Sequence, residues 1–129
     1  MYIRFVTTER NEGSDQATGL FAALYALERD GALAPHELEW FRTTEAWFNK
    51  HLPRPDRFRW SARPNAPRRA ISWFRLSAGE HVNRMRELAA LLEYKDIPVE
   101  ELQTDRPGYI LYEDEHQVTA VPFAAETFG

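Results

Sequence analysis

The chain opens with hydrophobic and polar residues in alternation. Ile3 and Phe5 flank Arg4 in a run rich in β-branched and aromatic residues. Alternation with a period of two places one set of side chains on one face of a strand. The pattern therefore predicts a strand over residues 2–7.

After residue 14 the apolar residues recur three and four positions apart, which is the spacing of one face of a helix. The first such run consists of Leu20, Phe21, Leu24 and Leu27. Ser14 or Asp15 is expected to cap this helix. Gly31 is expected to end it in the left-handed conformation.

A second helix is predicted between two prolines. Pro35 suits its first turn, and Pro53 prevents its continuation. Its apolar face consists of Leu38, Phe41, Trp47, Phe48 and Leu52. Because only a short link separates the two helices, they are expected to be antiparallel neighbours.

The next segment is rich in proline. Residues 53–67 contain four of the chain's eight prolines. Proline has no amide hydrogen to donate, so neither a regular helix nor a central strand is expected. We expect an irregular Arg/Pro-rich loop at about residues 53–70. Residues 70–76 are interpreted as a short helical turn that buries Trp73 and Phe74.

The C-terminal half predicts a third helix and three strands. Ser77 and Glu80 have the spacing of a capping box at the start of the helix. The strands are expected over residues 97–102, 109–113 and 117–122. Pro107 and Gly108 occupy the positions typical of a type II turn before the second of these strands. The last two strands are expected to form a hairpin with an acidic tip.

The resulting element order is β-α-α-loop-α-β-β-β. Helices grouped between one early strand and a late run of strands are typical of an α+β fold. A length of 129 residues suits a single domain. We expect residues 1–129 to form one domain with a small mixed or antiparallel sheet and with the helices packed on one of its faces.

The dipeptide Trp-Phe occurs three times, at residues 40–41, 47–48 and 73–74. The first two pairs are seven residues apart, so they lie on nearly the same face of a helix. The rings can form an aromatic core, or they can form an exposed stripe that binds a partner. A helix buries only one of two adjacent residues, so Trp40 is expected to remain partly outside.

The composition limits the classes of protein that fit. There is no cysteine, which excludes a disulfide scaffold, a cysteine nucleophile and a thiolate metal site. The N-terminal residues lack the pattern of a signal peptide, and no apolar run is long enough to span a bilayer. We therefore expect a cytoplasmic protein without a membrane partner.

The charge is distributed unevenly along the chain. Residues 54–75 carry seven arginines and one acid, a net charge of +6, whereas the whole chain carries −4. Residues 96–129 carry eight acids and one arginine, a net charge of −7. The chain is thus electrically polarised along its sequence.

No nucleotide, metal or nucleophile motif is present, so no cofactor is expected. The densest polar cluster is Glu113, Asp114, Glu115 and His116, and Asp105 is a further candidate carboxylate from elsewhere in the chain. Convergent carboxylates would suit a divalent cation, and a small metal-dependent hydrolase is the alternative function. Successive strand residues point to opposite faces, however, which favours a solvated turn.

Arginines surround Phe58 and Trp60 in the proline-rich loop. Guanidinium groups match the geometry of carboxylates and phosphates, and aromatic rings stack on bases or on guanidinium planes. Four interpretations are open. The arginines are solvated, or they pair with the protein's own acidic C-terminal third, or they bind an acidic protein, or they bind nucleic acid.

The missing motifs favour a non-enzymatic interaction module, adaptor-like or inhibitor-like, that binds an acidic protein or nucleic-acid partner. A sequence pI near 5.6 is less typical of general nucleic-acid binding. The residues expected to bind the partner are Arg54, Arg57, Arg59, Trp60, Arg63, Arg68, Arg69 and Trp40.

Overall fold

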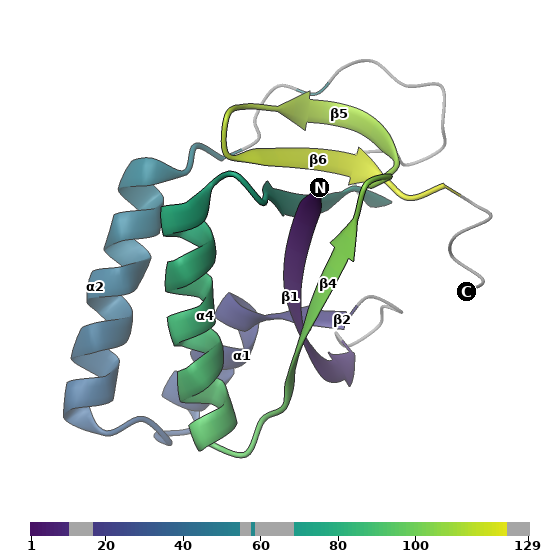
Figure 1. The fold of residues 1–129 in the computed structure, drawn as a ribbon. Coiled ribbons are helices and arrows are strands. Elements are labelled where there is room, and N and C mark those ends of the chain that lie inside the picture. Colours follow the sequence, from purple (N-terminus) through teal and green to yellow (C-terminus); the bar gives the residue numbers. More distant parts are fainter. Residues whose placement is uncertain (11–16, 55–57, 59–68, 124–129) are drawn as a thin grey trace. The chain divides into compact units, whose positions relative to one another are not determined.

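The computed structural model describes residues 1–10, 17–54, 58 and 69–123, and Figure 1 shows its three helices and six strands. The predicted α+β class is confirmed. The helices are α1 (Leu20–Arg29), α2 (Pro35–His51) and α4 (Gly79–Tyr94). The strands are β1 (Tyr2–Arg10), β2 (Ala17–Gly19), β3 (Ile71–Arg75), β4 (Val99–Thr104), β5 (Tyr109–Glu113) and β6 (Gln117–Val121).

The strands follow the order β2-β1-β3-β6-β5, and β4 pairs with β1. The chain divides into two compact units, and each consists of segments that are distant in sequence. The helical unit contains Phe5–Leu52 and Asn83–Leu102. The strand unit contains Met1–Arg4, Pro53–Val82 and Gln103–Gly129. The chain therefore passes from one unit to the other four times.

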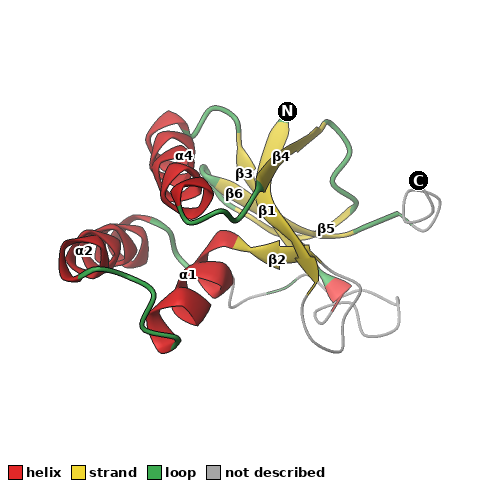
Figure 2. Cartoon of the chain, turned by 90° about the horizontal axis from the view of Figure 1, so that it is seen from below, coloured by secondary structure: helices red, strands yellow, loops and turns green. Residues whose placement is uncertain are grey.

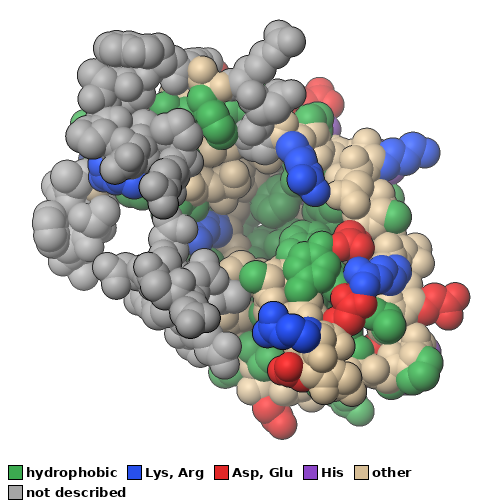
Figure 3. All heavy atoms as spheres, turned by 180° about the vertical axis from the view of Figure 1, so that it is seen from behind, with side chains coloured by type: hydrophobic (Ala, Val, Ile, Leu, Met, Phe, Trp, Pro, Cys, Tyr) green, Lys and Arg blue, Asp and Glu red, His purple; other side chains and the backbone are tan. Residues whose placement is uncertain are grey.

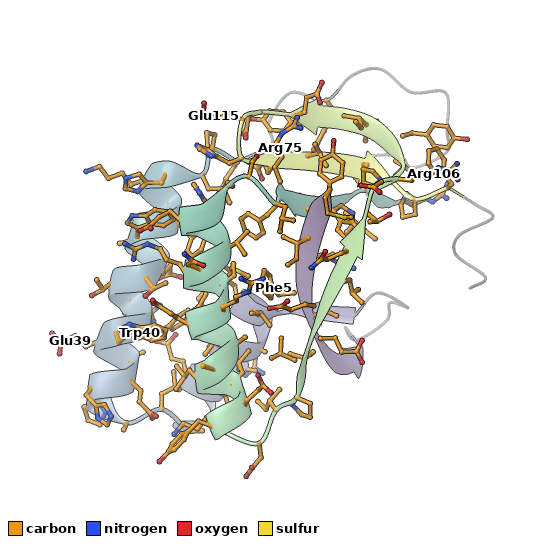
Figure 4. The ribbon with its side chains drawn as sticks, in the orientation of Figure 1. Phe5, Glu39, Trp40, Arg75, Arg106 and Glu115 are labelled. Atoms are coloured by element: carbon orange, nitrogen blue, oxygen red, sulfur yellow. The ribbon has the colours of Figure 1, made fainter. Side chains whose placement is uncertain are left out.

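In the helical unit, the helices lie together on one side of the strands that belong to it (Figure 2). Phe5 lies between β1 and α4 in Figure 4 and is almost fully buried. Phe41 of α2 has no exposed surface, and its ring is 6.3 Å from that of Phe21 in α1. Phe48 packs edge-on against the same Phe21 ring at 5.3 Å. The aromatic core interpretation is thus confirmed for this face of α2.

The start of α1 differs from the sequence prediction. The helix begins at Leu20, directly after the short strand β2, and not at a cap formed by Ser14 or Asp15. Pairing of β2 with the preceding strand β1 holds Ala17–Gly19 in an extended conformation. The end of α1 is as predicted, because Gly31 has φ +71°.

The second helix matches its predicted limits. Pro35 occupies the first turn, and Glu37 caps the helix by accepting a hydrogen bond from the Ala34 backbone at 2.7 Å. Glu37 also forms a 2.7 Å ion pair with Lys95. The hydrogen bond from Lys95, together with that from Ala34, lowers the pKa of the Glu37 carboxyl against the opposing effect of burial. One carboxylate thus caps α2 and ties it to the residue that follows α4.

The prediction of a helical turn at residues 70–76 is wrong. Ile71–Arg75 form strand β3, which pairs antiparallel with β1 and with β6. A run of five residues is too short for its apolar spacing to separate a helix from a strand. Neighbouring strands on both sides decide the conformation, and the Ser72 and Thr119 hydroxyls hydrogen-bond across β3 and β6 at 2.9 Å.

The C-terminal elements agree with the sequence prediction except at their ends. Helix α4 begins at Gly79, one residue later than a cap at Ser77 requires, and the Val82 amide donates to the Ala78 carbonyl. Strand β4 is shifted by two residues relative to the predicted range. The predicted hairpin is confirmed as β5 and β6, which pair antiparallel.

Candidate functional site

The predicted partner-binding residues lie largely outside the described residues. These are Arg57, Arg59, Trp60, Arg63 and Arg68. Arg54 and Arg69, at the two ends of the segment, are described and exposed, as is Phe58 between them. Within the described ranges, no carboxylate forms an ion pair with Arg54 or Arg69.

Arg75, at the other end of the positively charged region, is engaged within the protein. Its Nη2 lies 3.1 Å from Glu113 Oε2, and its Nε donates to the Asp114 carbonyl at 2.7 Å. Its guanidinium also lies over the Tyr2 ring at 5.7 Å. Figure 4 labels Arg75 beside the β5–β6 hairpin. Self-pairing with the acidic C-terminal third thus applies to Arg75.

Asp114 organises the tip of this hairpin. Its Oδ1 accepts hydrogen bonds from the His116 and Gln117 amides at 2.8 and 3.0 Å. Its Oδ2 accepts from the Tyr112 hydroxyl at 2.9 Å and from the Gln117 side chain at 3.1 Å. Burial alone would raise the pKa of Asp114, but these hydrogen bonds together lower it. The carboxylate is thus held charged by the turn that it closes.

The other residues of the predicted acidic centre make separate contacts. Asp105 lies 3.5 Å from the N-terminal amine, and Glu113 pairs with Arg75. The His116 ring stacks on buried His81 with centroids 4.3 Å apart, and its Nε2 lies 3.0 Å from Glu115. In the described part of the chain, no three His, Asp or Glu side chains gather in a way that could hold a metal ion.

Trp40 is half-buried on α2, beside fully buried Phe41, as expected for adjacent residues of a helix with one buried face. It belongs to the helical unit, whereas Arg54 and Arg69 belong to the strand unit. Trp47 of the same helix stacks on His51 at 4.4 Å and lies under the Arg84 guanidinium at 4.2 Å. The Trp47 ring thus joins α2 to Arg84 of α4 in the same unit.

Two side chains that the sequence analysis did not select lack polar partners. Arg4 of β1 is half-buried, and burial lowers the pKa of its guanidinium. The indole nitrogen of Trp73 in β3 is buried without a hydrogen-bond partner. The sequence signal for Arg4 was its position between two buried strand residues, Ile3 and Phe5. That signal alone does not distinguish a paired arginine from an unpaired one.

Several charged side chains of the helical unit form ion pairs on the surface. On the face shown in Figure 3, basic and acidic side chains of the described residues are intermixed and not separated by sign. In the helical unit Arg42 pairs with Glu28 and Glu45, and Arg86 lies 3.0 Å from Glu101. Exposed pairs of this kind contribute little to stability, about 0–1 kcal/mol each.

None of the described helices combines the length and the apolar character needed to cross a membrane. Comparison with models of known protein families, with curated proteins and with solved structures finds no match to this chain.

Proposed function

We propose that this protein is a non-enzymatic interaction module that binds an acidic protein surface through the arginine segment at residues 54–69. The observation that carries the proposal is the contrast between Arg75 and the arginines before it. Arg75 is held by Glu113 and by the Asp114 carbonyl. Arg54 and Arg69 are exposed and form no ion pair with any described carboxylate.

The acids nearest the C-terminus also favour an external partner. Glu113, Asp114 and Asp105 already contact Arg75, the hairpin amides and the N-terminal amine. These three carboxylates are thus already engaged in contacts within the protein. Arg54 and Arg69, which the protein's own described acids leave unpaired, are therefore available for recognition.

The chemistry of the segment suits carboxylates. A guanidinium can donate two parallel hydrogen bonds to one carboxylate, and arginine and aromatic residues are enriched at the centres of protein interfaces. Phe58 is an exposed ring within the segment. The negative net charge of the whole chain, −4, is less suited to a polyphosphate backbone than to a local acidic surface.

The test uses two labelled probes, a polyglutamate peptide and a single-stranded DNA oligonucleotide, with binding measured by fluorescence anisotropy. We expect the peptide to bind the wild-type protein. We expect the double variant Arg54→Gln/Arg69→Gln to bind it about tenfold more weakly, because two charge-assisted hydrogen-bonding groups are lost.

The matched control is the double variant Arg29→Gln/Arg86→Gln. It removes the same two charges from exposed positions outside the segment. An equal loss of binding in the control would show that only net charge matters, and would overturn the proposal. If the oligonucleotide bound and the peptide did not, the partner would be a nucleic acid and the proposal of an acidic protein partner would be wrong.

A further inference from the structure

Within the described part of the chain, Arg4 is a cation with no counter-charge. Its side chain is half-buried in strand β1, and desolvation is the only influence on its pKa, which it lowers. Among the residues that the structure describes, no oxygen accepts a hydrogen bond from this guanidinium and no carboxylate pairs with it. Partial burial of an arginine without an anion is unfavourable, and proteins usually avoid it.

Trp73 supplies a second unsatisfied donor. Its indole nitrogen exposes less than 1 Å² and has no hydrogen-bond partner. Most buried donors in native proteins are satisfied, and leaving one unpaired costs about 1–3 kcal/mol. An unsatisfied indole in the middle of a sheet therefore calls for a missing acceptor.

The strand register places the two donors on the same side of the sheet. Tyr2 pairs with Arg75 and Ile3 pairs with Phe74 across β1 and β3. Side chains of directly paired residues point to the same face, and they alternate along each strand. Arg4 and Trp73, which come next on the two strands, therefore share the face of Tyr2 and Arg75. The Arg75 guanidinium lies over the Tyr2 ring, which agrees with this assignment.

We propose that Arg4 and the Trp73 indole form a binding site for a single carboxylate group. One guanidinium balances one negative charge and can donate two parallel hydrogen bonds to a planar carboxylate. The indole N–H adds a neutral third donor. A phosphate dianion would require a further cation, and Arg75 on the same face is already neutralised by Glu113.

The neighbours of these donors indicate the rest of the ligand. Trp73 pairs with Val118 of β6, and Ile71 pairs with Ala120 two residues away on the same face. Ile71 and Trp73 are partly exposed, whereas Val118 and Ala120 have no exposed surface, so the apolar surface open to a ligand comes from β3. An apolar floor beside one cation suits a carboxylic acid with a hydrocarbon body, because the body removes apolar surface from water. The inference concerns different residues from the arginine segment and does not depend on the proposed function.

The test follows the Trp73 indole N–H in ¹H–¹⁵N NMR spectra during titration with sodium benzoate. The resonance is assigned with the variant Trp73→Phe. We expect a saturable shift of this resonance with benzoate and no comparable shift with sodium chloride or sodium phosphate. The variant Arg4→Gln should bind benzoate at least about tenfold more weakly, because it removes the charged guanidinium that makes a bidentate contact with the carboxylate.

The variant Arg86→Gln serves as control, since it removes an exposed arginine of the other unit. It should leave the benzoate titration unchanged. If Arg4→Gln fails to fold, Arg4→Lys provides a second test. Lysine keeps the charge but cannot donate two parallel hydrogen bonds, so weaker benzoate binding is again expected. No shift of the Trp73 resonance with benzoate, or an equal shift with phosphate, would overturn the proposal.

Discussion

The sequence predicted the turn at Gly108, but it revealed only one of the two reasons why this position requires glycine. The Pro-Gly pair predicted a turn that requires a positive φ at Gly108, and the observed φ is +130°. The stronger constraint is spatial. A Cβ at this position would lie 2.0 Å from the Val121 carbonyl oxygen, which belongs to the neighbouring strand. Both constraints exclude any other residue, and only the first is visible in the sequence.

Replacing Gly108 by alanine should therefore be strongly destabilising. We expect Gly108→Ala to reduce the free energy of unfolding by at least about 2 kcal/mol, because the new methyl group meets backbone that cannot move independently. Urea unfolding at pH 7 measures this loss.

Gly79→Ala is the matched control for that measurement. Gly79 opens helix α4 and has nothing within 4 Å of the position of an added Cβ. The change should keep the unfolding free energy within about 1 kcal/mol of the wild-type value. Equal effects of the two substitutions would contradict the steric explanation for Gly108.

For the other residues, the success of the sequence prediction depends on whether their contacts are local or distant in sequence. Gly31 and Pro35 were predicted correctly because their roles depend on the local backbone. The ion pair of Glu37 with Lys95 was not predicted, because it joins residues far apart in the chain. The isolation of Arg4 was equally unpredictable, since only a folded structure shows which carboxylates fail to reach it.

At the scale of elements, the β5–β6 hairpin depends on the four hydrogen bonds that Asp114 accepts. Asp114→Ala should lower the free energy of unfolding by about 1–3 kcal/mol, because it leaves partly buried donors unsatisfied. Asp114→Asn should cost less, since one side-chain oxygen can still accept from the two amides. Urea unfolding at pH 7 measures both.

The same carboxylate predicts a dependence on pH. Its folded-state pKa is lowered, so its contribution is fully present above the usual aspartate pKa of about 3.9. That contribution disappears as the pH falls through the lower pKa of the folded state. The stability difference between wild type and Asp114→Ala should therefore shrink in acid. Glu115→Ala, a change at a mostly exposed neighbour, is the control and should show no such trend.

Element prediction succeeded where apolar periodicity was long. Helix α2 and the hairpin strands match their predicted ranges closely, because many turns or a strong turn signal define them. Strands β2 and β3 were missed, since they have three and five residues and form by pairing with other strands. Short elements depend on partners that sequence periodicity does not reveal.

At the scale of the whole molecule, the uneven distribution of charge was evident from the sequence. The contacts that the charged residues make in the folded protein were not. Five of the eight C-terminal acids make contacts that do not involve Arg54 or Arg69. By sequence, the largest surplus of positive charge lies in the arginine segment, whose proposed role is to bind an acidic partner.

The division into two units leads to a final prediction about cooperativity. Strands β1 and β4 and helix α4 each contribute residues to both units. Phe41→Ala empties a fully buried position of the helical unit and should lower its stability by about 3–5 kcal/mol. Because three continuous elements run through both units, the strand unit should lose the same stability. Hydrogen exchange should report equal losses for the amides of α2 and of β6. If the β6 amides kept their wild-type protection from exchange while the α2 amides lost protection, the two units would unfold separately. A two-state transition requires all probes to agree.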